Sequence, residues 1–372
     1  MFCLGLRGLR LGVEGSFIKL SKSKEVPMKI LISGGAGMVG SHCAEHFVKN
    51  KHKVIIVDNL LRSKIFGSKE KSVEYNWHYL KQFKNITFFK KDIRDKEEMQ
   101  RIFKKVKPDV VIHTAGQPGV RFSLEQPMED YSINATGTLN LLEALRNVNS
   151  KGIFIYCSTN KVYGHNVNDI AIKQKAKRYE FKNIEGIDEN CSIDLTGHTP
   201  YGVSKLTGDL YVQDYGHGYG LKTGVFRMSC IYGTRQFGFE DQGWLAWFAI
   251  RYLLRKPITI FGDGKQLRDV LWVDDLVNAF ECFIKSDIKT NVFNIGGGYK
   301  NTLSLLELIK LLENCSDRKV PIKYGPWRQF DQKVYISDIK KAKKLLKWKP
   351  KVSPEEGVER LYSWLKENWE NK

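Results

Sequence analysis

The chain has 372 residues, of which 42% are hydrophobic and 27% charged, which is ordinary for an enzyme of two domains or of one large α/β unit. It has no run of eighteen or more apolar residues, so we expect no membrane partner. The net charge of +19 is spread widely and comes with no nucleic-acid-binding motif, so we expect no nucleic-acid partner either.

The seven cysteines are scattered along the chain, and none is paired at a spacing typical of a metal site. This usage is typical of reduced thiols in a cytoplasmic protein. We therefore expect a cytoplasmic location and no bound metal. The first 27 residues give only a weak signal or transit pattern, because glycines interrupt the apolar stretch, and we treat residues 1–27 as an extension outside the fold.

From Met28 onward, buried apolar runs alternate with helical patterns. Strands are expected near residues 28–33, 53–58, 86–91, 109–115, 152–157 and 222–228. Helices are expected over residues 38–50, 96–106, 130–148 and 200–219. This alternation predicts an α/β fold, a doubly wound parallel sheet of the Rossmann type with helices on both faces.

The later elements are more mixed. The polar segment 164–199 has no clear period, and we expect it to form a loop over the site. After it we expect a helix over 243–255, a strand over 257–261, a helix opened by Asp274, a strand over 291–295, a helix from the capping box at Ser304 to about 314, and a last helix over 355–370. We expect the NAD-binding domain to comprise residues 28–229 and about 272–296. A smaller mixed α/β substrate-binding part would comprise about 230–271 and 297–372.

A glycine-rich turn follows the first strand and opens a helix, as a dinucleotide fingerprint requires. Gly34, Gly37 and Gly40 fit GxxGxxG, and Gly35 gives the overlapping GxGxxG. Glycines let the backbone approach a pyrophosphate, and the helix N-terminus then stabilises its charge. The turn predicts a dinucleotide cofactor.

The choice between NAD and NADP depends on the end of the second strand. Asp58 stands there, about twenty residues after the turn, where a carboxylate binds ribose hydroxyls and repels a 2′-phosphate. This favours NAD. Arg62 and Lys64 follow closely and would favour a 2′-phosphate, so the alternative stays open.

Tyr201 and Lys205 are four residues apart and lie on one face of a predicted helix. A free tyrosine titrates near pH ~10, so acting as a base at neutral pH needs a drop of roughly three units. A neighbouring cation lowers a pKa by about one to three units. Lys205 and the positive nicotinamide would together supply this drop, which predicts a site for proton and hydride transfer.

Several further strings resemble one family. They are Asp92-Ile93, His113 to Gln117, Asn134 to Asn140, Val162-Tyr163-Gly164, Arg227 with Tyr232-Gly233, and Gly264 to Asp269. With the glycine turn and the Tyr201/Lys205 pair, they make residues 28–372 similar to the extended short-chain dehydrogenase/reductase family of nucleotide-sugar epimerases and dehydratases.

The resemblance implies roles for individual residues. Thr159 would hydrogen-bond the reacting hydroxyl beside Tyr201, and Lys205 would complete the catalytic group. The residues implied for NAD are Gly34, Gly37, Met38, Val39, Gly40, Asp58, Asn59, Asp92, Ile93, Ala115, Gly116, Gln117, Asn134, Tyr201 and Lys205. Dehydratases of the family carry Asp-Glu directly after the threonine, where this chain has Asn160 and Lys161. Neither offers a carboxyl proton, so the resemblance favours epimerisation or a one-way reduction.

Rarer strings resemble one subgroup, the CDP-paratose 2-epimerases, also called CDP-tyvelose epimerases. They are Ser158 to Gly164, Tyr232 to Phe237, Asp241 to Trp244, Gly264 to Asp269, Arg178-Tyr179 and Arg328 with Asp331-Gln332. A CDP-sugar is therefore the favoured substrate partner, and the product would serve surface-glycan synthesis. Gly119 to Ser123 is instead closer to UDP-uronate 4-epimerases, so a UDP-sugar 4-epimerase is the alternative. A non-catalytic dinucleotide-binding scaffold is the alternative from a different class.

Seven residues are candidates for substrate binding: Arg121, Ser123, Asn160, Gln236, Gln242, Arg268 and Arg328. Among them, Arg268 and Arg328 would clamp the diphosphate, because a guanidinium binds phosphate oxygens in pairs. The resemblance also implies a homodimer or homotetramer that pairs through the helices expected over 130–148 and 200–219.

Overall fold

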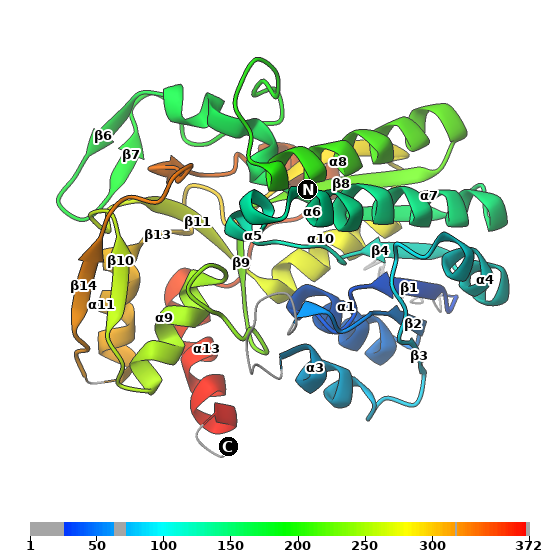
Figure 1. The fold of residues 1–372 in the computed structure, drawn as a ribbon, viewed down its shortest axis with the longest axis horizontal. Coiled ribbons are helices and arrows are strands. Elements are labelled where there is room, and N and C mark those ends of the chain that lie inside the picture. Colours follow the sequence, from blue (N-terminus) through cyan, green and yellow to red (C-terminus); the bar gives the residue numbers. More distant parts are fainter. Residues whose placement is uncertain (1–25, 63–71, 317, 370–372) are drawn as a thin grey trace, which may run out of the picture.

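The computed structural model describes residues 26–62, 72–316 and 318–369. Its centre is a seven-stranded sheet in the order β12-β8-β5-β4-β1-β2-β3, and every pairing in it is parallel (Figure 1). The strands are β1 (Lys29–Ser33), β2 (Lys53–Val57), β3 (Ile86–Phe89), β4 (Val110–His113), β5 (Ile153–Thr159), β8 (Lys222–Met228) and β12 (Thr290–Ile295). Most of them are short runs of buried apolar residues, as the sequence predicted.

Helices cover both faces of this sheet. One face packs against α1 (Met38–Lys49), α3 (Ser72–Leu80), α10 (Val273–Lys285) and α12 (Lys340–Leu346). The other packs against α4 (Lys96–Val106), α7 (Gly137–Val148) and α8 (Pro200–Tyr219). Figure 1 shows the two layers above and below the strands. The doubly wound Rossmann-type fold predicted from the sequence is confirmed.

The order of the strands determines where a ligand binds. From β1 the chain moves outward to β2 and β3, then returns to pair β4 on the other side of β1. Ser33 and His113 are register partners at the carboxyl ends of these two strands. In open α/β sheets a crevice forms at such a reversal, outside the carboxyl ends of the strands. The glycine turn after β1 opens directly onto it.

The remaining elements form a second, smaller layer at the left of Figure 1. A mixed sheet joins β9 (Cys230–Tyr232), β11 (Leu267–Trp272), β13 (Thr302–Ser304) and β15 (Val334–Tyr335), and β10 (Ile258–Phe261) pairs β14 (Ile322–Gly325). The helices α9 (Trp244–Leu253), α11 (Leu305–Ser316) and α13 (Pro354–Trp369) enclose a separate apolar core. The predicted capping box is present, since Ser304 Oγ accepts from the Glu307 N–H at 3.2 Å and Glu307 Oε2 accepts from the Ser304 N–H at 2.9 Å.

Two predicted segments differ in the structure, and α3, β9, β11, β13, β14 and β15 had no predicted counterpart. The segment 164–199 is not wholly a loop, because it contains the end of a 3₁₀ segment, η2 (Asn160–Asp169), and a hairpin of β6 (Ile172–Gln174) and β7 (Tyr179–Phe181). Strands of three residues carry too little alternation to be predicted. Distant contacts hold the hairpin instead: Arg178 Nε donates to Glu307 at 2.7 Å and the Tyr179 hydroxyl to Asp263 at 2.5 Å.

The helix predicted over 130–148 is the second difference. It is divided into α6 (Pro127–Tyr131), a π-helical turn η1 (Ser132–Thr136) and α7, and α5 (Val120–Glu125) precedes it. Side-chain periodicity does not reveal a single wide turn. Among the described helices, none is both long and apolar enough to cross a bilayer.

Candidate active site

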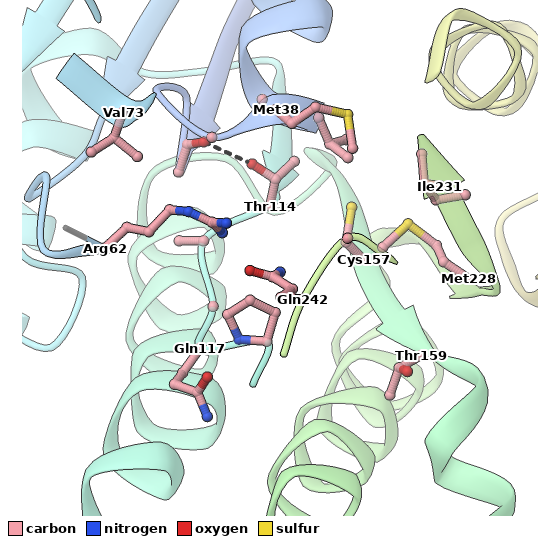
Figure 2. Close-up of a pocket in the computed structure, with 18 of the residues that line it drawn as sticks. Met38, Arg62, Val73, Thr114, Gln117, Cys157, Thr159, Met228, Ile231 and Gln242 are labelled. Atoms are coloured by element: carbon pink, nitrogen blue, oxygen red, sulfur yellow. Dashed lines mark hydrogen bonds between the residues drawn. The ribbon is translucent and has the colours of Figure 1, made fainter. Parts of the chain in front are cut away.

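A cavity of about 460 Å³ opens at the carboxyl ends of β1, β4 and β5, within the usual size of small-molecule sites. Figure 2 shows Met38 and Thr114 at the glycine-turn side of this cavity, and Cys157 and Thr159 along β5. Most of the predicted site residues line it: Gly34, Gly37, Met38, Val39, Gly40, Asp58, Asn59, Asp92, Ile93, Ala115, Gly116, Gln117, Thr159, Asn160, Tyr201, Lys205, Gln236 and Gln242. Five do not: Asn134, Arg121, Ser123, Arg268 and Arg328.

The glycine turn brings the backbone close to the cavity. Gly34 has φ +73°, and a Cβ there would lie 2.5 Å from the backbone nitrogen of Ala115. A Cβ on Gly40 would overlap the Gly34 carbonyl oxygen. At Gly37 that same oxygen, at 3.2 Å, is the nearest neighbour of an added Cβ. The turn thus leaves room above the N-terminus of α1, where a pyrophosphate is stabilised by the backbone N–H groups.

Asp58 is held in place by the turn that it faces. Its Oδ2 accepts from the Ala36 N–H at 2.9 Å and its Oδ1 from the Leu60 N–H at 2.8 Å. Burial raises the pKa of this carboxyl, and the two hydrogen bonds oppose the rise. A carboxylate has about four acceptor positions, so Asp58 retains capacity for ribose hydroxyls. Arg62 also lines the cavity, whereas Lys64 lies outside the described residues, so the preference for NAD over NADP stays a prediction.

Asn59 and Asp92 line the cavity together with the glycine turn and Asp58, and we call this part the cofactor half. The Asn59 amide donates to Asp92 Oδ2 at 2.9 Å, and an Arg94 nitrogen donates to the same oxygen at 2.7 Å. Burial alone would raise the pKa of Asp92, but the hydrogen bonds from Arg94 and Asn59 lower it below its usual value. Asp92 is therefore a fixed, charged group beside Ile93.

Asn134 lies outside the cavity lining but hydrogen-bonds to Gln117, which is part of the lining. It lies in the π-helical turn η1 and is 1% exposed. Its Oδ1 accepts from the Gln117 N–H at 2.9 Å, and its amide donates to the Gln117 carbonyl at 3.0 Å and to Ser204 Oγ at 3.1 Å. The structure thus assigns Asn134 a contact with the strand-end loop and with α8, and π-helical turns are frequent at functional sites.

Thr159, Tyr201 and Lys205 come together where β5 meets the first turns of α8. Burial raises the pKa of Tyr201 to about 12, and hydrogen bonding with Thr159 opposes this rise. Burial also lowers the pKa of Lys205 to about 8, and its Nζ lies 4.2 Å from the centre of the Tyr156 ring. The pKa of Tyr201 is thus raised in this structure, and the expected fall stays a prediction for the NAD-bound protein.

The local sequence positions α8 for this arrangement. Thr199 caps the helix by accepting from the Gly202 N–H at 3.2 Å, and Pro200 occupies its first turn. The helix therefore begins just before Tyr201. Tyr201 and Lys205 then point their side chains toward β5 from successive turns of α8, as their spacing of four residues predicted.

The half of the cavity beside Thr159, lined by Asn160, Gln236 and Gln242, contains amides with incomplete hydrogen bonding. We call it the substrate half, because these residues are candidates for substrate binding. The Oε1 atoms of Gln236 and Gln242 are buried and have no hydrogen-bond partner among the described residues. Figure 2 shows Gln242 near the middle of the view. Asn160 donates to Gln332 Oε1 at a long 3.4 Å. Polar groups of this kind are available to a ligand.

The predicted arginines lie around this half of the cavity and not in its lining. Arg268 forms an ion pair with Asp331 at 2.6 Å, and Arg328 forms one with Asp241 at 3.2 Å. Asp241 does line the cavity. Both arginines are thus held by carboxylates, one of them directly at the cavity, and their role as a diphosphate clamp stays a prediction.

Arg121 and Ser123 lie on α5 next to Val120, which lines the cavity, but they are outside the lining themselves. The Arg121 side chain is 72% exposed, 3.1 Å from Glu125 and 3.8 Å from Asp241. Ser123 is buried and donates to the Val120 carbonyl at 2.7 Å. Their predicted contact with substrate is therefore not visible in this structure.

Sequence reasoning assigned no binding or catalytic role to several residues that line the cavity, among them Lys161, Asp241 and Trp244. Lys161 follows Thr159 by two positions, so its place in the chain was an available signal. Trp244 begins α9, its ring N–H lies 3.4 Å from Cys230 Sγ, and it contributes to the cavity wall.

Comparison with known proteins identifies the family. The model of the NAD-dependent epimerase/dehydratase family matches residues 30–296. The chain is 41% identical over 345 residues to the CDP-paratose 2-epimerase of Salmonella typhi, covering 91% of this chain and 99% of that relative. The UDP-glucose 4-epimerase of Thermotoga maritima, solved with UDP-glucose, matches with a TM-score of 0.77 and 33% identity, covering 91% and 99% of the two chains. The UDP-glucuronic acid 4-epimerase of Bacillus cereus, solved with UDP-glucuronic acid and NAD, matches with a TM-score of 0.77 and 29% identity, covering 92% and 100%. The chain belongs to the NAD-dependent epimerase/dehydratase family.

Proposed function

We propose that this protein is an NAD-dependent nucleotide-sugar epimerase, an isomerase that converts CDP-paratose to CDP-tyvelose by inverting C2 of the sugar. The observation that carries the proposal is one cavity that joins the glycine turn to Thr159, Tyr201 and Lys205. The similarity to the CDP-paratose 2-epimerase of Salmonella typhi supports the choice of substrate.

The residues of the cavity fit NAD. Room above Gly37, the N-terminus of α1 and the fixed carboxylate of Asp58 suit a pyrophosphate followed by a ribose. Asp92 and Ile93 would border the adenine, and Ala115 and Gly116 would line the path to the nicotinamide. When bound, NAD supplies a hydride acceptor that can return the hydride, together with a positive charge beside Tyr201.

The chain's own residues accept and return the proton of the reacting hydroxyl. Tyr201 removes the proton from the C2 hydroxyl, which Thr159 orients through a hydrogen bond. Lys205 stays beside them as a cation and stabilises the tyrosinate. Because Asn160 and Lys161 offer no carboxyl group, the site has no acid of the kind that expels water in the dehydratases. Inversion of one carbon is the reaction that these groups support.

A UDP-sugar 4-epimerase is the second candidate, acting on a hexose or a uronic acid. The two proteins of known structure reported above are UDP-sugar 4-epimerases. They have the same fold as this chain and are 33% and 29% identical to it. The Gly119 to Ser123 string was its support in the sequence. The exposure of Arg121 weakens that support, because a residue that is 72% exposed and outside the lining does not hold a buried sugar.

The deciding experiment is incubation of the purified protein with CDP-paratose in deuterium oxide, followed by proton NMR of the sugar. We expect the manno-configured product without solvent deuterium at C2, because the hydride returns internally. Deuterium at C2 would instead indicate proton abstraction from carbon. Bound NAD without conversion of CDP-paratose would contradict the proposal, and turnover of UDP-glucose or UDP-glucuronic acid would then establish the second candidate. No turnover of any nucleotide sugar would favour the non-catalytic scaffold.

We also propose that the protein is a homodimer or homotetramer in the cytoplasm. The free state of the six described cysteines supports a reducing compartment. Exposed apolar side chains gather on α5, α6 and α8, namely Leu124, Met128, Tyr131, Val203, Leu210 and Tyr211. Such a patch on neighbouring helices is typical of an interface between subunits. Sedimentation analysis of the wild type and of Leu210→Glu tests this, and a monomeric wild type would contradict it.

A further inference from the structure

Lys161 lies in the substrate half of the cavity, and none of the steps above uses it. Its backbone N–H donates to the Thr159 hydroxyl at 3.2 Å. Its side chain reaches the loop that precedes β15, where Nζ donates to Gln332 Oε1 at 3.4 Å. It lines the same cavity as Thr159 and Tyr201. A lysine therefore stands beside the hydroxyl that would hold the reacting oxygen.

The charges around Lys161 favour an incoming anion. The titratable groups that act on it are Arg268 on β11, Asp331 before β15 and Cys230 on β9. The Asp331 carboxylate is already engaged by Arg268 at 2.6 Å, and the Gln332 amide is neutral. Burial, followed by repulsion from Arg268, lowers the pKa of Lys161 to about 8. Two cations thus face one carboxylate, and an anion would restore the balance of charge.

The chemistry of the substrate indicates which anion this is. A nucleotide sugar carries its diphosphate on C1, and C2 is bonded directly to C1. When C2 faces Tyr201, the phosphate attached to the sugar must lie close to the reacting carbon. When C4 faces Tyr201, the sugar ring separates the two. A cation near the catalytic threonine therefore suits a 2-epimerase better than a 4-epimerase.

On the basis of the proposed function, we infer that Lys161 binds the phosphate attached to the sugar and so holds C2 at Thr159 and Tyr201. A lysine suits this place, because its ammonium binds phosphate as a compact charge and its flexible stem reaches an oxygen beside the ring. Arg268 lies next to it and would contact the same diphosphate. Lys161 is then a residue that determines which carbon reacts.

Binding of CDP-glucose to the NAD-loaded protein tests this, measured by calorimetry at pH 7 and pH 9. The diphosphate of this probe does not change its charge over that range. Lys161 is charged below its pKa and neutral above it, so the affinity of the wild type should fall by about tenfold from pH 7 to pH 9. Lys205 also has a pKa of about 8, but it is the same in every variant compared.

Three variants separate the charge of Lys161 from its shape. Lys161→Met should weaken binding at pH 7 by about ten- to a hundredfold, as expected for a lost charged hydrogen bond. Lys161→Arg should keep most of the affinity at pH 7 but lose the fall toward pH 9, since a guanidinium stays charged. Lys333→Met is the matched control, because Lys333 is exposed and outside the cavity lining, and it should behave like the wild type.

Two results would overturn the inference. One is a pH dependence in Lys161→Arg equal to that of the wild type, which also decides the matter if Lys161→Met does not fold. The other is an equal loss of affinity for cytidine in Lys161→Met, because cytidine has no phosphate. The proposed function is tested separately, by wild-type turnover of CDP-paratose. Turnover with no effect of Lys161 on CDP-glucose binding would reject this inference alone.

Discussion

The two halves of the cavity are built in different ways. In the cofactor half, three of the groups predicted to contact NAD already have protein partners: Asp58 is held by backbone N–H groups, Asp92 by Asn59 and Arg94, and the Gln117 backbone by Asn134. In the substrate half, buried amide oxygens of Gln236 and Gln242 have no partner among the described residues, and Gln332 receives two hydrogen bonds of 3.4 Å. Preorganised groups suit a cofactor that stays bound through many cycles. Incompletely paired groups suit a sugar that must enter, turn and leave.

The largest effect should come from the residue at the junction of the two halves. Tyr201→Phe should lower turnover of CDP-paratose by about 10²–10⁴-fold, the usual contribution of a general base, while bound NAD is retained. Turnover is measured by proton NMR and NAD by its absorbance after denaturation. Tyr299→Phe is the matched control, since Tyr299 is 53% exposed and outside the cavity lining. Full activity of Tyr201→Phe would refute the mechanism.

The next effect is on the free energy of unfolding and concerns a buried ion pair outside the cavity. Asp209 and Arg227 form an ion pair at 2.9 Å behind β5, with side chains 0% and 5% exposed. Asp209→Asn leaves Arg227 buried without its counterion and should lower the free energy of unfolding by about 3–5 kcal/mol. Urea denaturation measures this.

Asp331→Asn is the comparison for that change. Its partner is Arg268, and the two side chains are 12% and 23% exposed, beside the substrate half but outside the cavity lining. We expect a loss of about 1 kcal/mol or less. Equal losses in both variants would show that the two ion pairs contribute equally to stability despite their different burial.

The smallest effect should come from the rim of the cavity. Arg121→Ala removes a side chain that is 72% exposed and paired with Glu125. The KM for CDP-paratose should change by about twofold or less, because exposed ion pairs contribute little. A larger rise in KM, specific to UDP-glucuronic acid, would revive the uronate 4-epimerase alternative. Steady-state kinetics on both substrates distinguishes these outcomes.

The sequence predicted the sheet and the cofactor half well, because both depend on local signals. Ile30 to Ile32 form a fully buried apolar run, Gly34 is required by its φ of +73°, and Gly40 by its close approach to the Gly34 carbonyl within the same turn. The substrate half depends on contacts between distant segments. Lys161 and Gln332 are 171 residues apart, and Arg328 and Asp241 are also far apart in the chain. No local pattern encodes such pairs.

The route of the chain through the large sheet has a consequence for synthesis on the ribosome. Strand β12 becomes the edge strand beside β8 only after the chain has passed through β9, α9, β10, β11 and α10. A nascent chain that ends near residue 229 therefore exposes the long edge of β8, and such edges pair with other chains. The central sheet is complete only when residues 290–295, which form β12, have emerged from the ribosome. Expression of the N-terminal part alone is accordingly expected to give an aggregating fragment, and gene fusions or truncations must keep the chain whole through β12.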